Sequence, residues 1–452
     1  MRIVIVGAGT TGLFAALVLA RTGHNVALVE KDPLPAPIDA AAVESWSRPG
    51  TPQAQLPHAF MARGRALLAT HAPDVLAALF EVGAHDFELA SFVPGGERLA
   101  SDEELRVVFC RRPLFESVLW RAVEREPRIE LWCATSVVAL RPENVLVTER
   151  GELGAELIID AGGRRSPFAR WVGAPEALVE PCGLVYYSTY FRLRPGAELP
   201  RGPWLWGPRA ELPFATAIVH LADRGYYSIT FGVPIHDAEL KILRDRRAFA
   251  AICALLPAFA PWADEARAEP VTDVLAMGGL QNVLRERPYA PGVIAIGDAL
   301  CHTNAAYGWG VSLGMEHAVA LAEILQGAPS IEEATSAYHD RVGPETRARW
   351  ELSVQQDRAR VSAWRGEPFD ARDQRAAVQR ALAPAVMLDP VVFRAVMRSA
   401  LLLDDADALL DPALIARARL ASARSTQATL APVAERDEVL AAVRVALATA
   451  PA

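Results

Sequence analysis

The sequence predicts an α/β fold with three parts: a three-layer domain built on a βαβ unit, an inserted antiparallel β-sheet domain, and C-terminal helices. A short apolar run, a glycine-rich turn and an Ala- and Leu-rich segment open the chain and predict the βαβ unit. Segments of alternating polarity predict the antiparallel sheet. A stretch rich in Ala, Arg and Leu predicts the helices. The predicted boundaries assign residues 1–180 and 286–345 to the first domain, 181–285 to the second, and 346–452 to the helical region.

The local patterns predict the elements in order. Residues 3–6 form a short, continuous apolar run that suits a buried parallel strand. A helix follows over residues 13–22, and a second strand over residues 25–29. The proline-rich stretch 31–60 predicts an extended segment that covers a ligand. Further predicted elements are helices at 60–80 and 111–125, a β-meander at 131–160, and a hairpin formed by 215–221 and 226–233 around the turn 222–225.

Size, charge and cysteine usage exclude several classes of protein. The chain has 452 residues, enough for two or three domains, and its formal net charge is -8. Negative charge argues against a nucleic-acid partner, which usually demands a basic surface. No stretch reaches the ~18 uncharged apolar residues of a membrane span. The five cysteines include no C-x-x-C pair, so we expect no disulfide framework, no metal site and a cytoplasmic location.

The glycines of the first turn indicate a dinucleotide site. Gly7 permits a tight turn from strand to helix, Gly9 lets a pyrophosphate approach the backbone, and Gly12 lets helix and strand pack closely. The amino end of the helix offers unpaired N–H groups to phosphates. Glu30 lies 18 residues beyond Gly12, where its carboxylate can accept hydrogen bonds from ribose hydroxyls.

Later segments carry a resemblance to a known family. The segment Arg112-x-x-Phe115-x-x-x-Leu119, the segment 160–166 (DAGGRRS), the segment 292–299 (GVIAIGDA), and Asn304 followed by Gly308 and Gly310 occur in this order. Together they resemble the glutathione-reductase-type FAD-dependent oxidoreductases, in particular the group A flavoprotein monooxygenases. The stretch Arg48 to Gln53 with His58, and the stretch 183–188, resemble a bacterial subgroup of tailoring epoxidases and hydroxylases of secondary metabolism.

The resemblance implies FAD as cofactor and a set of residues that contact it. In this family an arginine corresponding to Arg112 meets FAD, an aspartate corresponding to Asp298 binds the ribityl or ribose region, and the helix that begins near Gly310 faces the flavin. The complete set of implied cofactor residues is Gly7, Gly9, Thr11, Gly12, Glu30, Lys31, Arg112, Val138, Gly297, Asp298, Gly308, Gly310 and Val311.

The resemblance also implies monooxygenation, in which a flavin C4a-hydroperoxide hydroxylates or epoxidises a hydrophobic aromatic or alkene-containing small molecule. The chemistry requires no protein nucleophile, so we assign no catalytic residue; His58 and His302 lie near the implied flavin site, and each is either an acid–base group or an ordinary polar residue. Candidate substrate residues are Tyr186, Tyr190, Arg192, Tyr227, Phe231 and Trp309. Aromatic residues on strands are more often ordinary core, which is the alternative for this set.

Three departures keep other activities open. Gly162 and Gly163 stand where NADPH-using hydroxylases carry Asp-Gly, so the electron donor is NADPH or NADH acting directly, or a partner flavin reductase. Ala305 replaces a proline and Trp309 an arginine of the flavin loop. A reductase or dehydrogenase on a similar substrate is the main alternative, followed by a non-catalytic flavin-binding protein. A halogenase is disfavoured, because Trp204-Leu205-Trp206 is not followed by Ile-Pro.

Overall fold

The computed structural model describes residues 1–33, 43, 46, 48, 56–202, 204–286, 290–370, 372–424 and 435–448. Its first sheet has five parallel strands in the order β19-β10-β1-β2-β6. The strands are β1 (Arg2–Val6), β2 (Asn25–Val29), β6 (Ile129–Trp132), β10 (Leu157–Asp160) and β19 (Val293–Ala295). Side chains alternate along β1, so Ile3 and Ile5 face one layer while Val4 faces the other.

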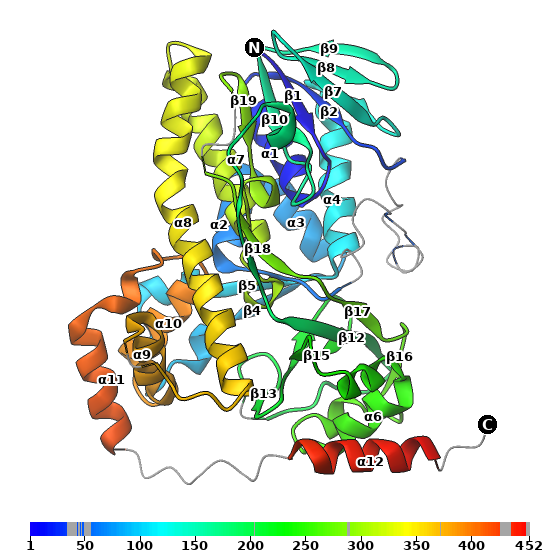
Figure 1. Ribbon diagram of the computed structural model, residues 1–452, viewed down its shortest axis with the longest axis vertical. Helices are drawn as coiled ribbons and strands as arrows, with labels where there is room; N and C mark the ends of the chain where they lie inside the picture. Colours follow the sequence, from blue (N-terminus) through cyan, green and yellow to red (C-terminus); the bar gives the residue numbers. More distant parts are fainter. Residues whose placement is uncertain are drawn as a thin grey trace.

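Helices cover one face of this sheet and a β-meander covers the other, which gives three layers (Figure 1). The helices are α1 (Thr10–Arg21), α2 (Ala62–His71), α3 (Pro73–Glu81), α4 (Arg112–Arg125) and α7 (Gly310–Gly327). The meander consists of β7 (Val137–Arg141), β8 (Val145–Thr148) and β9 (Gly151–Gly154), and α5 (Phe168–Trp171) packs beside it. The single helix predicted over 60–80 is two helices, because Pro73 starts a new helix at its first turn.

The second large sheet is antiparallel, with the strand order β13-β14-β15-β12-β16 and with β17 also paired to β12. Its strands are β12 (Leu184–Leu193), β13 (Arg209–Leu212), β14 (Ala215–Leu221), β15 (Tyr226–Pro234), β16 (Ala268–Pro270) and β17 (Leu275–Met277). Helix α6 (Arg246–Leu255) packs on one face, and the other face turns toward the first domain. The predicted hairpin is the β14–β15 pair.

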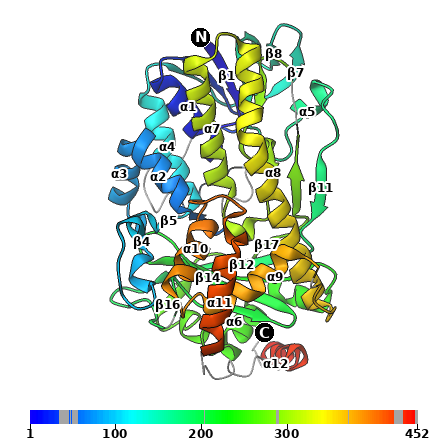
Figure 2. The same ribbon diagram turned by 90° about the vertical axis from the view of Figure 1, so that its left-hand side faces the viewer.

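Two small sheets and a helical region connect the parts. The small sheets are β3 (Ala59–Phe60), β5 (Arg106–Phe109) and β4 (His85–Glu88), and β11 (Leu178–Pro181), β18 (Gln281–Leu284) and β20 (Cys301–His302). The later helices are α8 (Ile331–Trp364), α9 (Gln374–Leu382), α10 (Pro390–Ala400), α11 (Pro412–Arg424) and α12 (Arg436–Ala448). Helix α8 runs along both halves of the molecule (Figure 2). The boundary predicted at 345/346 therefore falls inside one continuous helix.

The α/β fold class predicted from the sequence is confirmed: a three-layer domain, an inserted antiparallel sheet and C-terminal helices are all present. Within the part of the chain that the structure describes, no helix combines the length and the apolar character that a bilayer span requires.

Candidate active site

Two glycines of the first turn are required by the fold itself. Gly7 has φ +103°, and a Cβ atom there would lie 2.5 Å from the Ala161 carbonyl oxygen. A Cβ atom at Gly12 would overlap the Gly7 carbonyl oxygen. These contacts explain why β1 can turn directly into α1 beside β10.

Gly9 has a different reason to be glycine. Its φ is -72°, a conformation that any residue adopts, and the nearest atom to a Cβ there would be the Arg112 guanidinium, 3.8 Å away. Helix α1 begins at this residue with no side-chain cap, so the N–H groups of its first turn point into the same space. Uncapped N–H groups opposite a guanidinium suit a pyrophosphate, and the residues present therefore fit FAD.

Glu30 lies at the end of β2 and is bonded within the chain. Its Oε2 accepts from the Ala8 N–H at 2.7 Å and pairs with Arg48 at 3.1 Å, and its Oε1 accepts from the Asp32 N–H at 2.9 Å. Each carboxylate oxygen can accept two hydrogen bonds, so Oε1 keeps capacity for a ribose hydroxyl. The carboxylate is held in position by these contacts.

A network of buried charged side chains lies beside Arg112. Glu116 is fully buried and accepts from Arg112 at 2.8 Å, from Arg48 at 2.8 Å and from the Thr10 hydroxyl at 3.1 Å. Burial disfavours its ionised form, yet the charges of Arg112 and Arg48 prevail and lower the pKa of Glu116 to about 2. Glu116 thereby fixes Arg112, the guanidinium that faces Gly9.

This network predicts a pH dependence of stability. The pKa of Glu116 is depressed from 4.5 to about 2 in the folded protein, so its contribution is complete above pH 4.5 and disappears as the pH falls toward 2. Glu116→Gln should lower the stability at pH 7, and the difference from wild type should shrink by about 2 kcal/mol between pH 4.5 and pH 3. Urea midpoints between pH 7 and pH 3 measure it. Glu124→Gln, on the exposed side of α4, should follow wild type; a Glu116→Gln difference that stays constant with pH would contradict the assignment.

His58 is neutral in this environment. Its Nδ1 lies 2.7 Å from the Leu56 carbonyl oxygen and its Nε2 lies 3.2 Å from an Arg112 nitrogen, so Nδ1 donates and Nε2 accepts. Burial and the Arg112 charge lower the pKa of His58 to about 3. His58 therefore orients Arg112, and its neutral imidazole is not a general acid at neutral pH.

The segment 297–310 approaches the same edge of the parallel sheet. The Gly297 N–H donates to His317 Nδ1 at 3.1 Å, and a Cβ at Gly310 would lie 3.3 Å from Asp298 Oδ1. Helix α7 starts at Gly310 with no side-chain cap, which leaves its first N–H groups available to an electron-rich ring. The side chain of Thr11 packs against Gly297 instead of facing the space beside Gly9.

Asp357 of α8 holds this loop in place. It accepts from Asn304 Nδ2 at 2.6 Å, from the Tyr307 hydroxyl at 3.0 Å, from Asn282 Nδ2 at 2.8 Å and from Arg360 at 2.8 Å. Asn304 Oδ1 in turn accepts from the hydroxyl of Tyr186 at 2.8 Å. The antiparallel sheet thus touches the predicted flavin loop through one buried hydrogen bond.

The face of the antiparallel sheet that turns toward this loop is polar. We call it the inward face. Cross-strand pairing places the following residues on it: Tyr186, Ser188, Tyr190 and Arg192 of β12, Thr216, Ile218 and His220 of β14, and Tyr226, Ser228 and Thr230 of β15. The inward residues of β14 are half-buried while their neighbours facing α6 are buried, as expected where one face borders a ligand space.

Two of the predicted substrate residues lie on the opposite face. Tyr227 stacks on Phe191 and donates from its hydroxyl to the Trp262 carbonyl oxygen at 2.5 Å. Phe231 packs edge-on against Phe249 of α6. Because side chains alternate along β15, both belong to the core under the sheet, and we remove them from the substrate set.

Trp309 is also a core residue. It packs with Leu313, Leu352 and Leu402, and its indole N–H donates to the Ala400 carbonyl oxygen at 3.0 Å. Its ring packs against the C-terminal region, so Trp309 is not a substrate residue. Its contacts with that region hold the loop before α7 in position.

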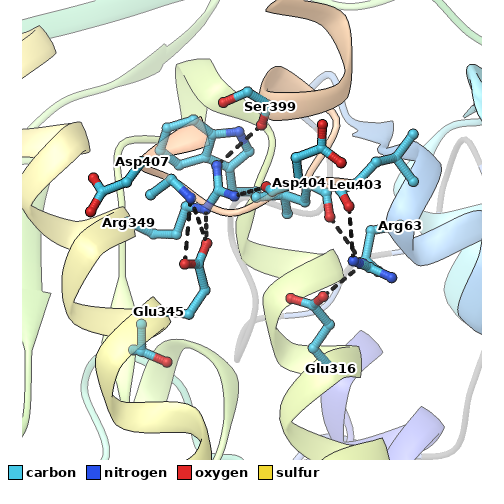
Figure 3. A network of polar contacts seen from close by, with 12 residues as sticks. Arg63, Glu316, Glu345, Arg349, Ser399, Leu403, Asp404 and Asp407 are labelled. Carbon is cyan, nitrogen blue, oxygen red and sulfur yellow. Dashed lines mark hydrogen bonds and ion pairs between the residues drawn. The ribbon is translucent and has the colours of Figure 1, made fainter. Parts of the chain in front are cut away.

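The C-terminal segment 399–404 is fastened behind the loop by two arginines (Figure 3). Arg349 donates to the carbonyl oxygens of Ser399 and Asp404 and pairs with Glu345. Arg63 donates to the carbonyl oxygens of Leu402 and Leu403 and pairs with Glu316 at 2.8 Å. Residues beyond 346 therefore contact the segments that carry the candidate site.

Three further predicted residues lie at the periphery of the candidate site. Arg192 pairs with Glu269 at the sheet edge, Lys31 is exposed after β2, and Val138 lies at an irregularity of β7 with its side chain exposed. Gly308 has φ +68°, and Val311 is the second residue of α7. Of the stretch Arg48 to Gln53, only Arg48 is described; residues 49–53 lie outside the described part of the chain.

Sequence reasoning missed several residues that the fold brings together. Glu116 follows Arg112 by four positions on one helix, and that spacing could have indicated the pair. The alternation of β14 could have indicated His220. Asp357 carried no signal, because a residue of a distant helix reaches the loop only through tertiary packing.

Comparisons with known proteins agree with this geometry. Residues 2–127 match the family described as FAD dependent oxidoreductase. PnpA, the p-nitrophenol 4-monooxygenase of Pseudomonas putida DLL-E4, is 18% identical over 91% of this chain and 98% of its own, with a TM-score of 0.63. PqsL of P. aeruginosa in complex with 2-aminobenzoylacetate is 17% identical over 80% and 96%, with a TM-score of 0.61. The Diels-Alderase PyrE3 is 16% identical over 88% and 80%, with a TM-score of 0.59. No curated protein matches the sequence.

Residues 2–127 thus match the family of FAD-dependent oxidoreductases. The chain as a whole shares its fold with solved structures such as p-nitrophenol 4-monooxygenase and PqsL.

Proposed function

We propose that this protein is an FAD-dependent monooxygenase that hydroxylates or epoxidises a hydrophobic, aromatic or alkene-containing small molecule. The observation that carries the proposal is the hydrogen bond between Tyr186 of the inward face and Asn304 of the loop before α7. It joins the polar inward face to the loop that the family resemblance assigns to the flavin. Similar structures act on or bind small aromatic molecules, as p-nitrophenol and 2-aminobenzoylacetate indicate.

The chain's own residues would divide the work of binding. The amino end of α1, Gly9 and Arg112 would hold the pyrophosphate, and Glu30 would accept from the ribose. Asp298 and the amino end of α7 would meet the flavin end. When bound and reduced, FAD supplies activated dioxygen for transfer of one oxygen atom to the substrate. The buried Tyr186 and Tyr190 would line the substrate space and exclude water from it.

The proposal includes an electron donor and a cellular compartment. NADPH or NADH, directly or through a partner flavin reductase, would reduce the flavin, and the five unpaired cysteines favour a reducing cytoplasm. The segment 160–166 lacks the acidic residue of NADPH-using hydroxylases at the aligned place, which favours the partner. A dehydrogenase on a similar substrate remains the second candidate, because the site holds FAD equally well for both reactions.

Oxygen reactivity separates the two functions. We expect FAD-loaded protein, photoreduced without oxygen, to be reoxidised within seconds on mixing with aerated buffer, and ¹⁸O₂ to label the product of a turned-over aromatic or alkene substrate. Anaerobic mixing with NADH or NADPH, followed at 450 nm, identifies the donor. Substrate oxidation under strict anaerobiosis, with no ¹⁸O in the product, would establish the dehydrogenase instead. Protein that does not bind FAD would remove both.

A further inference from the structure

Two buried polar atoms of the inward face have no hydrogen-bond partner among the residues that the structure describes. His220 of β14 and Ser228 of β15 are directly paired across the strands, so their side chains lie side by side on one face. Neither His220 Nδ1 nor Ser228 Oγ makes a hydrogen bond, although both atoms are buried and Ser228 is fully so. Buried polar atoms are bonded in the great majority of cases, so the unused hydrogen-bonding capacity of this pair suits a polar group of a ligand.

Neighbouring polar groups of the same face are satisfied. The hydroxyls of Ser188 and Thr230 bond to one another at 2.8 Å, and the Tyr186 hydroxyl donates to Asn304. On the described inward face, the buried polar atoms without a hydrogen-bond partner are therefore confined to one position. It lies next to Tyr190, which is the cross-strand partner of Ser228.

The charges around the spot select an uncharged ligand group. Arg111 forks onto Asp223 at 2.8 Å, and its guanidinium lies 3.8 Å from the centre of the Tyr226 ring. Arg192 pairs with Glu269 at the edge of the sheet. Arg111 and Arg192 are thus each paired with a carboxylate. Burial, with a smaller effect of Arg209, lowers the pKa of His220 to about 4, so its imidazole is neutral and can donate or accept.

From this arrangement, we propose that His220 and Ser228 form the specificity-determining polar end of the substrate pocket and bind one neutral hydroxyl, carbonyl or amide group of an otherwise apolar substrate. The inference rests on the proposed function, because it takes the inward face as the substrate surface. It adds the substrate class: a small molecule with a neutral polar group that reaches β14 and β15, as opposed to a carboxylate or a pure hydrocarbon.

A pair of serine variants tests whether the spot is built for a ligand. Ser228→Ala removes an unpaired hydroxyl, so the melting temperature of the FAD-loaded protein should stay constant or rise. Ser188→Ala, at a matched buried position of the same face, leaves Thr230 without its partner and should lower the melting temperature by roughly 1–3 °C. A clear loss of stability in Ser228→Ala would show that the hydroxyl has a structural partner and would overturn the proposal.

Three probes of one shape test the chemical class. Binding of 2-naphthol, naphthalene and 2-naphthoate is followed by the change in flavin absorbance and by protein fluorescence. We expect 2-naphthol to bind the most tightly, and Ser228→Ala and His220→Phe each to weaken it by about three- to tenfold, while naphthalene binding stays unchanged. Glu124→Gln, on the exposed side of α4, should keep the wild-type preference. Equal affinities for naphthalene and 2-naphthol, preference for 2-naphthoate, or no binding of 2-naphthol up to its solubility limit would each overturn the proposal.

These readouts are independent of turnover. Protein that binds FAD and shows the expected probe preference, but incorporates no oxygen, would remove the monooxygenase and keep the specificity assignment. Protein that oxygenates a substrate while Ser228→Ala and His220→Phe leave all three affinities unchanged would keep the function and remove the assignment.

Discussion

Gly9→Val should abolish tight FAD binding, lowering the affinity by at least about 100-fold, while the FAD-free protein keeps its melting temperature. The backbone at Gly9 has φ -72°, which valine adopts without strain, and the nearest atom to a new Cβ is 3.8 Å away. The added methyl groups would occupy the space between the amino end of α1 and Arg112, where we propose that the pyrophosphate binds. Titration of FAD-depleted protein followed by flavin fluorescence measures the loss.

A second glycine supplies the control for this prediction. A Cβ at Gly343, inside α8, meets no atom within 4 Å, so Gly343→Ala should bind FAD as wild type does and should be slightly more stable. Wild-type affinity in Gly9→Val would show that the pyrophosphate does not lie at this turn. A large fall in the melting temperature of the FAD-free variant would show that Gly9 is needed for folding instead.

Asp223→Ala should cost about 3–5 kcal/mol of unfolding free energy, the largest stability effect that we expect of a single substitution. Asp223 is fully buried in the β14–β15 turn and accepts from the Arg111 backbone N–H at 2.8 Å and from its guanidinium at 2.8–3.1 Å. Removing the carboxylate leaves the Arg111 charge buried and uncompensated between the antiparallel sheet and the start of α4. Urea denaturation followed by far-UV circular dichroism measures the loss.

A surface pair provides the comparison. Asp74 makes two hydrogen bonds to Arg21 at 2.8 and 2.9 Å, yet its side chain is 58% exposed. Solvent screens that pair, so Asp74→Ala should cost less than about 1 kcal/mol. If the two substitutions cost the same, burial does not decide the strength of the Arg111–Asp223 pair, and its role in joining the sheet to the first domain would be refuted.

Local sequence patterns were enough to predict the turns and strands that short-range sterics and side-chain alternation determine. The turn of Gly7, Gly9 and Gly12 was predictable, because steric contact between β1, β10 and α1 demands glycine at Gly7 and Gly12, and the proposed pyrophosphate site accounts for the third. The period of two in β14 and β15 likewise predicted the hairpin. Proline explains the one misjudged helix, since Pro73 divides what hydrophobic spacing alone presents as continuous.

The sheet face on which a side chain lies, and its hydrogen-bond partners, could not be predicted from local patterns. Tyr186 and Tyr227 read alike along the chain, yet one meets the loop before α7 and the other enters the core on α6. Strand register decides the face, and register depends on pairing between segments that are forty residues apart. Asp357 is a similar case, because its four partners come from three separate segments.

By itself the sequence determined the fold class, the glycine turn at α1 and the expectation of FAD, since each follows from short-range sterics and from motif order along the chain. Only the tertiary structure decided which aromatic residues belong to the core, that Glu116 and His58 orient Arg112, and that His220 and Ser228 stand together without partners. Burial and hydrogen bonding between distant segments are properties of the packed chain, so no local pattern encodes them.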